Sequence, residues 1–186
     1  MFIRTRRLFL RPAWAEDARA LHDAIASWEV VKNLSRAPWP YGLADAEAFT
    51  RGRVLEPGET SFLIFARTDG DPLLVGSIGF GRRCASDDDA ELGYWIARDH
   101  WGRGYATEAG HAVVELAFDG LRLPALTAGH FADNPASGAV LRKLGFRATG
   151  ETRTVPCAAR GCELPTPLYA LARDEWACRM PFCLAA

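Results

Sequence analysis

The sequence lacks a marked excess of charge of either sign. Its 186 residues carry 22 lysines and arginines against 23 aspartates and glutamates, which gives a formal net charge of -1 at pH 7. Proteins that bind nucleic acids usually present a clear excess of basic residues to the phosphates. The charge balance therefore predicts that the protein has no nucleic-acid partner.

Long hydrophobic runs are also absent. Arg, Asp or Gly interrupts every apolar run well before it reaches the roughly 20 residues that a membrane-spanning helix needs. The first residues, Met1 to Pro12, include basic side chains but no continuous apolar core of the kind found in secretory signals. We therefore expect no membrane association and a cytoplasmic location.

Cysteines are few and odd in number. The five cysteines cannot form a fully paired disulfide framework, and a chain of this length does not need one for stability. Cys157 and Cys162 are separated by four residues, as are Cys178 and Cys183, which leaves a zinc site open as an alternative. Free thiols are the simpler interpretation, so we predict no metal site.

The composition is that of an ordinary globular protein, with 49% hydrophobic and 24% charged residues. No linker, repeat or low-complexity segment interrupts the chain, so residues 1–186 are predicted to form one mixed α/β domain. Hydrophobic spacing and turn residues locate the expected elements. The expected strands cover 6–11, 61–67, 73–82, 90–97, 126–131, 147–155 and 168–172, and the expected helices 18–28, 44–55, 106–117 and 134–144.

A glycine-rich turn lies between the strand at 90–97 and the helix that follows it. The turn reads Gly102-Arg103-Gly104, and the small residues Ala106 and Thr107 begin the helix. Unpaired backbone N–H groups and the positive end of the helix dipole make such a helix start an anion site. The pattern is neither a P-loop nor a dinucleotide fingerprint. It favours a pyrophosphate site, with a plain strand-to-helix turn as the alternative.

Four motifs follow one another in a characteristic order. They are Glu91-Leu92-Gly93-Tyr94-Trp95-Ile96, Trp101 to Ala109, Asn134-Pro135-Ala136-Ser137 and Leu144-Gly145-Phe146. In this combination the chain resembles the GNAT acyl-CoA-dependent N-acetyltransferases, most of all the branch that acetylates the N-termini of bacterial ribosomal proteins. The resemblance extends from residues 7–12 to residues 168–171. It implies an α+β fold with a central mixed, mostly antiparallel sheet flanked by helices, and a single N-acetyltransferase domain with acetyl-CoA as co-substrate.

The resemblance also implies which residues hold acetyl-CoA. Backbone amides between Gly102 and Thr107 would bind the pyrophosphate, and the end of the 90–97 strand would pair with the pantetheine arm like an added strand. The family usually has Gln or Arg three residues before the first glycine, where this chain has Asp99, so only the side-chain contacts to phosphate are expected to differ. The implied cofactor residues are Trp95, Ile96, Ala97, Trp101, Gly102, Arg103, Gly104, Tyr105, Ala106, Thr107, Asn134 and Lys143.

Glu91 is the candidate general base. Strand alternation places Glu91, Gly93 and Trp95 on one face, and Leu92, Tyr94 and Ile96 on the other. A carboxylate there could accept the proton of an amine, directly or through one water, and Gly93 leaves room for the substrate. The alternative is a solvated glutamate near an acidic turn.

Ser137 is the candidate acid. Asn134 as N-cap, Pro135 at the first helical position and Gly145 at the exit explain the helix by themselves. Many GNAT enzymes carry an acidic Tyr four residues before the Gly-Phe pair, but this chain has Leu141 there. The resembling branch implies that Ser137 protonates the leaving thiolate, whereas the alternative is a purely structural serine.

Two histidines are weaker candidates for a base. His111 lies within a predicted helix and His130 within a predicted strand, where a lone histidine is more often packed or exposed than catalytic. His130 is the better of the two because its strand should border the cofactor cleft.

The acceptor amine is left open by the sequence. An α-amine, with a pKa near 7.7 to 8.0, needs a weaker base than lysine, so an N-terminal amine suits Glu91 best. Trp28, Trp39 and Tyr41 could form an aromatic wall for such an acceptor. The alternatives are an aminoglycoside or polyamine acetyltransferase, which an acidic pocket would favour, and a non-catalytic acyl-CoA-binding module. Both enzymes would transfer directly in a ternary complex, since no cysteine is expected at the reaction centre; a homodimer is compatible with the family.

Overall fold

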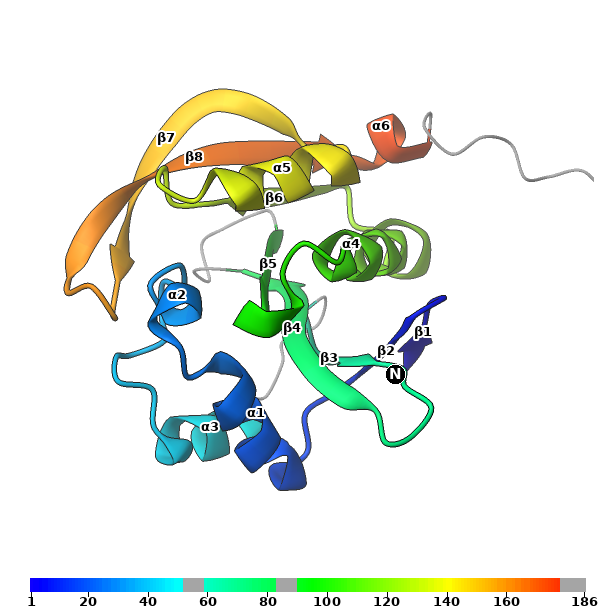
Figure 1. The fold of residues 1–186 in the computed structure, drawn as a ribbon. Coiled ribbons are helices and arrows are strands. Elements are labelled where there is room, and N and C mark those ends of the chain that lie inside the picture. Colours follow the sequence, from blue (N-terminus) through cyan, green and yellow to red (C-terminus); the bar gives the residue numbers. More distant parts are fainter. Residues whose placement is uncertain (52–58, 83–89, 178–186) are drawn as a thin grey trace, which may run out of the picture.

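The computed structural model describes residues 1–51, 59–82 and 90–177. Their strands form a single sheet of eight, in the order β1-β2-β3-β4-β5-β6-β8-β7 (Figure 1). The strands are β1 (Ile3–Arg4), β2 (Leu8–Arg11), β3 (Thr60–Ala66), β4 (Leu73–Gly81), β5 (Ala90–Ile96), β6 (Ala125–Gly129), β7 (Arg147–Cys157) and β8 (Cys162–Ala172). The helices are α1 (Ala18–Ile25), α2 (Trp28–Val31), α3 (Leu43–Thr50), α4 (Tyr105–Glu115), α5 (Pro135–Leu144) and α6 (Arg173–Ala177).

All neighbouring strands in the sheet are antiparallel except β5 and β6, which run parallel. Parallel neighbours need a long crossover connection, and α4 supplies it here between β5 and β6. The mixed, mostly antiparallel sheet flanked by helices is therefore confirmed.

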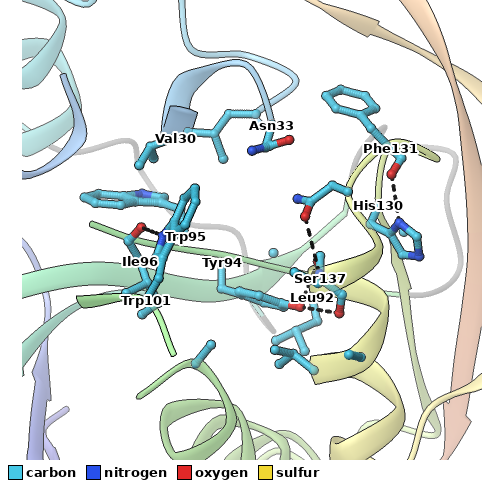
Figure 2. Close-up of a pocket in the computed structure, with 18 of the residues that line it drawn as sticks. Val30, Asn33, Leu92, Tyr94, Trp95, Ile96, Trp101, His130, Phe131 and Ser137 are labelled. Carbon is cyan, nitrogen blue, oxygen red and sulfur yellow. Dashed lines mark hydrogen bonds between the residues drawn. The ribbon is translucent and has the colours of Figure 1, made fainter. Parts of the chain in front are cut away.

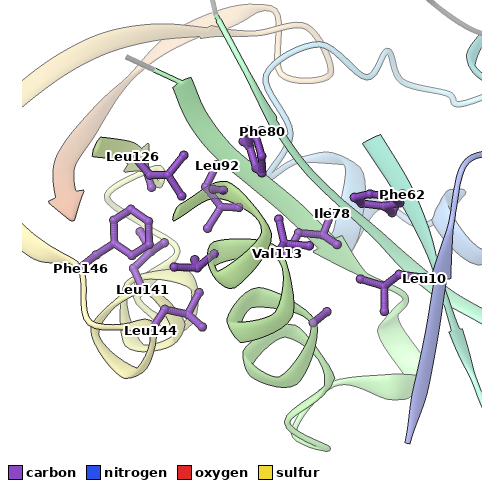
Figure 3. Packing of buried hydrophobic residues seen from close by; sticks show 14 of the residues in the cluster. Leu10, Phe62, Ile78, Phe80, Leu92, Val113, Leu126, Leu141, Leu144 and Phe146 are labelled. Atoms are coloured by element: carbon purple, nitrogen blue, oxygen red, sulfur yellow. The ribbon is translucent and has the colours of Figure 1, made fainter. Parts of the chain in front are cut away.

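Both faces of the sheet are buried, each under its own helices. On one face, Phe62 and Ile64 of β3 pack with residues of α4 and α5, such as Val113 and Leu141 (Figure 3). On the other face, Leu63 packs with α1 and α2. A strand buried on both faces reads as a continuous hydrophobic run, and β3 does so over Phe62 to Ala66.

Several expected elements differ in extent from those observed. The helix expected over 18–28 is two helices, because Ser27 leaves the helical conformation and its Oγ accepts a hydrogen bond from the N–H of Val30 as the N-cap of α2. The final strand begins at Cys162 rather than 168, and it accommodates Pro165 and Pro167 while pairing with β7. The helix expected over 44–55 is described only to Arg51, where α3 has ended.

The parallel pair of strands separates soon after it begins. Pairing joins Ala90 to Leu126, Glu91 to Thr127 and Leu92 to Ala128, and no residue of β5 beyond Leu92 pairs with β6. The rest of β5 keeps its pairing to β4 and leaves its other edge open. This opening in the middle of the sheet is where the candidate site lies.

None of the helices in the described part of the chain has the length and apolar character needed to span a membrane.

Candidate active site

A pocket of about 520 Å³ fills the opening between β5 and β6. Its walls come from β5, the glycine turn, the first turns of α4 and α5, and the segment that follows α2 (Figure 2). Most of the residues singled out in the sequence meet here. Those that line the pocket are Glu91, Trp95, Ile96, Trp101, Gly102, Gly104, Tyr105, Ala106, Thr107, Asn134, Ser137 and Lys143. Two do not line it, Ala97 and Arg103.

The glycine turn adopts a conformation that favours glycine. Gly102 and Gly104 have φ angles of 73° and 78°, in the left-handed region that other residues enter only at a cost. Gly104 is the N-cap of α4, and the first backbone N–H that returns to the turn is that of Glu108, which donates to the Gly104 carbonyl. The preceding amides of the first helical turn are therefore available to an anion at the pocket.

An ion-pair network holds the glycine turn and the start of α4 in place. Glu108 accepts hydrogen bonds from the Thr5 hydroxyl at 2.6 Å and from Nε of Arg7 at 2.6 Å. Arg7 also donates from Nη1 to the carbonyl of Arg103 at 3.0 Å. Burial alone would raise the pKa of Glu108, but these hydrogen bonds and the Arg7 charge lower it overall. The sequence analysis missed this support, because the partners lie about 100 residues apart.

The open edge of β5 presents alternate backbone groups to the pocket. The N–H of Ala97 donates to Val75 at 2.8 Å, on the β4 side, so Ala97 is turned away from the open edge. By alternation, the backbone groups of Ile96 and Tyr94 face that edge. The carbonyl of Ile96 already accepts a hydrogen bond from Nε1 of Trp101 at 2.7 Å. Tyr94 therefore offers the backbone groups that an extended ligand can pair with, a residue the sequence analysis left without a role.

Glu91 lies on the face of β5 opposite to Tyr94, as the alternation predicted. Its side chain is 21% exposed, and Oε2 lies 3.8 Å from Nη1 of Arg153 on β7. A Cβ added at Gly93 would meet nothing within 4 Å, so the space beside Glu91 is open. Arg153 is another residue that could not be predicted from the sequence.

Ser137 lies at the start of α5, and its cap is the one expected. Asn134 Oδ1 accepts a hydrogen bond from the Ser137 N–H at 3.4 Å, and Pro135 occupies the first position of the helix. The Ser137 hydroxyl lies 2.8 Å from the hydroxyl of Tyr94 (Figure 2). Burial raises the pKa of Tyr94 to about 12, so its hydroxyl is protonated at neutral pH.

His130 lines the pocket, but both of its ring nitrogens are engaged. Nδ1 lies 2.8 Å from the carbonyl of Phe131, which can only accept, so Nδ1 carries the proton. Nε2 then accepts from the Tyr169 hydroxyl at 3.3 Å. These bonds favour a structural histidine. His111 packs against Trp176 instead, where burial lowers its pKa, and it does not line this pocket.

The segment that follows α2, which forms part of the pocket wall, is held by the tip of the β7–β8 hairpin. Arg160 Nε donates to the carbonyl of Lys32 at 2.8 Å, and its Nη1 reaches Asp133 at 2.6 Å. The buried thiol of Cys157 lies 3.4 Å from the carbonyl of Leu34. The Lys32–Ser35 segment, which contributes pocket residues such as Asn33, is thereby fixed (Figure 2).

The aromatic wall expected for the acceptor does not line the pocket. Trp28 and Trp39 pack against each other with ring centroids 5.4 Å apart, and Tyr41 is buried among the side chains of α1 and α3. Among the described residues, no group of His, Cys, Asp and Glu is arranged to hold a metal. Cys178, Cys183 and the acidic run 87–89 lie outside the described residues.

Comparison with known proteins agrees with this geometry. The model of the acetyltransferase (GNAT) domain matches residues 7–147. YoaA of Bacillus subtilis, described as an uncharacterized N-acetyltransferase, is 30% identical over 182 residues, which cover 93% of this chain and 97% of YoaA.

Two solved structures illustrate the likeness in fold. RimL, a ribosomal L7/L12 alpha-N-protein acetyltransferase in complex with coenzyme A, superimposes with a TM-score of 0.78 at 20% identity, covering 94% of this chain and 99% of RimL. A chimera of the spermidine N-acetyltransferase SpeG from Vibrio cholerae and hSSAT superimposes with a TM-score of 0.74 at 18% identity, covering 93% of this chain and 99% of the chimera.

The fold and the family match define an N-acetyltransferase, an acyltransferase whose co-substrate is acetyl-CoA. The chain belongs to the GNAT acetyltransferase family.

Proposed function

We propose that the protein transfers an acetyl group from acetyl-CoA to the N-terminal α-amine of a protein or peptide, by direct transfer within a ternary complex. The observation that carries this proposal is the convergence of three features in one pocket. The amides at the start of α4, the open edge of β5 and the side chains of Glu91 and Ser137 all face the same 520 Å³ space.

The cofactor half of the pocket suits a pyrophosphate joined to an extended arm. The amides of Tyr105 to Thr107 offer hydrogen-bond donors and the positive end of the α4 dipole to the phosphates. The backbone groups of Tyr94 can pair with an amide-containing arm as a neighbouring strand would. Lys143, at the far end of α5, adds a positive charge to the lining.

Glu91 acts as the general base. Its carboxylate borders the open space beside Gly93, where an acceptor amine can approach the thioester. Proton transfer from the attacking amine to Glu91, directly or through one water, prevents positive charge from accumulating on nitrogen. An α-amine suits this base because it loses its proton near pH 8, whereas lysine holds its proton to a pH more than two units higher.

Ser137 supplies the proton that the departing thiolate needs. Its hydroxyl lies at the first turn of α5 and contacts Tyr94, whose side chain is on the face of β5 opposite to Glu91, so acid and base reach the pocket from different faces of the strand. This separation suits a direct transfer, because the two proton movements do not compete for one group.

The charge of the pocket favours an N-terminal amine over a polycation. Glu91 is the single carboxylate among the described residues that line the pocket, and Arg153 stands beside it. A site for a polyamine or aminoglycoside is expected to offer several carboxylates, one for each positive charge.

Thiol release from acetyl-CoA with a panel of acceptors tests the proposal. The panel contains short peptides with Ala, Ser or Met at the N-terminus, the same peptides with a blocked N-terminus, spermidine and an aminoglycoside. We expect release with the unblocked peptides alone, with mass spectrometry placing the acetyl group on the α-amine. Release with spermidine or the aminoglycoside alone would refute the peptide acceptor.

Glu91→Gln tests the assigned base within the same assay. Removing a general base lowers kcat by about 100- to 10,000-fold. The matched control is Glu163→Gln, on the exposed part of β8 outside the pocket lining, which should retain wild-type kcat. Equal rates for the two variants would exclude Glu91 as the base.

A further inference from the structure

The hydroxyl of Tyr94 makes two contacts with one residue, Ser137. Tyr94 Oη lies 2.8 Å from Ser137 Oγ and 3.0 Å from the Ser137 backbone oxygen (Figure 2). The two side chains come from different elements, β5 and α5, and meet inside the pocket. The contact with Tyr94 holds the Ser137 hydroxyl in one position, although a serine side chain could otherwise rotate about its Cα–Cβ bond.

The directions of these hydrogen bonds follow from counting protons. A backbone oxygen can only accept, so the single proton of Tyr94 is donated to the Ser137 carbonyl. Ser137 Oγ–H then donates to Tyr94 Oη. If Ser137 turned its proton elsewhere, Oγ would be free to accept a hydrogen bond from Tyr94, which lies within 2.8 Å.

We propose that Tyr94 is a positioning residue for Ser137, and that it donates a hydrogen bond to Ser137 Oγ as that oxygen gives its proton to the leaving thiolate. The inference rests on the proposed function and adds a residue to it. The acceptor nitrogen forms a bond to the acetyl carbon while the bond from that carbon to sulfur breaks, and the sulfur keeps the electron pair. The sulfur takes the proton of Ser137, and the amine proton passes to Glu91. Glu91 then releases that proton to solvent, and solvent restores the proton of Ser137.

The physical reason is that a serine hydroxyl is by itself a poor acid. Negative charge develops on Oγ as its proton leaves, and a neighbouring O–H donor stabilises that charge most in a site shielded from water. Tyr94 is partly buried and packs against the buried cluster under α4 and α5, which limits the access of water to its hydroxyl. Because the hydrogen bond to Oγ forms only as charge develops, it should affect kcat rather than KM.

Tyr94→Phe, Ser137→Ala and the double variant test this coupling. We expect Tyr94→Phe to lower kcat by about 10- to 100-fold, the effect of one hydrogen bond to a charged group, while both KM values stay within about twofold. In the Ser137→Ala background the same change should alter kcat by less than about twofold, because the group that Tyr94 positions is gone.

Tyr169→Phe is the matched control. Tyr169 is buried, whereas Tyr94 is partly buried, and its hydroxyl is likewise hydrogen-bonded, here to Nε2 of His130; it does not line the pocket. Removing the Tyr169 hydroxyl should leave kcat within about twofold of wild type. The comparison separates the role of Tyr94 from the general effect of removing a hydrogen-bonded tyrosine hydroxyl. Thermal unfolding of both variants confirms that each is folded at the assay temperature.

Each outcome has a separate meaning. An equal loss in both backgrounds, a loss confined to the KM for acetyl-CoA, or no loss at all would overturn the role of Tyr94 and leave the acetyltransferase intact. A Ser137→Ala variant with wild-type kcat would overturn both the role of Ser137 as the acid and the role of Tyr94 in positioning it. The assay uses whichever acceptor the thiol-release panel identifies. If the panel identifies none, it follows hydrolysis of acetyl-CoA by water, because the same thiolate leaves in both reactions. A wild-type protein that releases no thiol to any of these overturns the proposed function as well.

Discussion

Replacing Gly102 by alanine should weaken acetyl-CoA binding as well as destabilise the fold. The φ angle of Gly102 is 73°, and a Cβ built there meets no atom within 4 Å. The substitution is therefore free of clashes, and its cost is the backbone strain of a left-handed alanine, about 1–2 kcal/mol. For a chain of this size that strain lowers the melting temperature by about 2–8 °C.

The effect on binding follows from how the turn relieves the strain. A shift of the turn toward ordinary φ values moves the amides that begin α4 away from the phosphate position. Losing one hydrogen bond to a charged group costs about 1.5–3 kcal/mol, so Kd for acetyl-CoA should rise about 10- to 150-fold. Isothermal titration calorimetry with acetyl-CoA measures this directly.

Gly150 provides the matched control. It has a φ angle of 85°, and a Cβ there also meets nothing within 4 Å, but Gly150 lies on β7 outside the pocket lining. Gly150→Ala should lower the melting temperature by a similar amount and leave Kd unchanged. If the two variants bind acetyl-CoA equally well, the turn does not hold the pyrophosphate and the reasoning is wrong.

Two further predictions concern the supports of the pocket. The pKa of Glu108 is lowered in the folded protein relative to its unfolded value of 4.5. The carboxylate therefore makes its full contribution to the free energy of unfolding above pH 4.5. That contribution is lost as the pH falls through the lower pKa of the folded protein. Glu108→Gln should therefore flatten the acid dependence of stability, measured by urea unfolding from about pH 6 to 3; an unchanged slope would contradict the network with Arg7. Arg160→Gln removes the link between the Lys32 carbonyl and Asp133, so KM for the acceptor should rise by about 3- to 30-fold while KM for acetyl-CoA stays constant. Steady-state kinetics in both substrates decide this, and a change confined to acetyl-CoA would count against it.

The features that could be predicted from the sequence are those that depend on residues close together along the chain. The glycine turn at 102–104 and the Asn134 cap of α5 depend on local backbone conformation, so residue type and spacing were enough to predict them. The strands expected over 61–67 and 73–82 and the alternation along β5 were likewise correct. The split between α1 and α2 was missed because hydrophobic spacing continues across Ser27, although its capping side chain was the signal that could have revealed it.

The residues that the sequence analysis missed depend on contacts between distant parts of the chain. Tyr94 meets Ser137 across 43 positions, and Arg7 meets Glu108 across 101. The alternation already placed Tyr94 on the face away from Glu91, but nothing in the sequence showed that α5 would present Ser137 there. Conversely, Trp28 and Trp39 were expected at the acceptor site on residue type alone, and packing turned them toward each other.

The sequence by itself therefore determined the class of fold, the family and the place of the glycine turn before α4, because each is set by patterns of neighbouring residues. Only the tertiary structure decided where β5 and β6 part, which side chains meet in the resulting pocket, and which partners surround Glu91 and Ser137. The reason is physical: strand pairing and helix packing bring together groups whose separation along the chain carries no information about their distance in space.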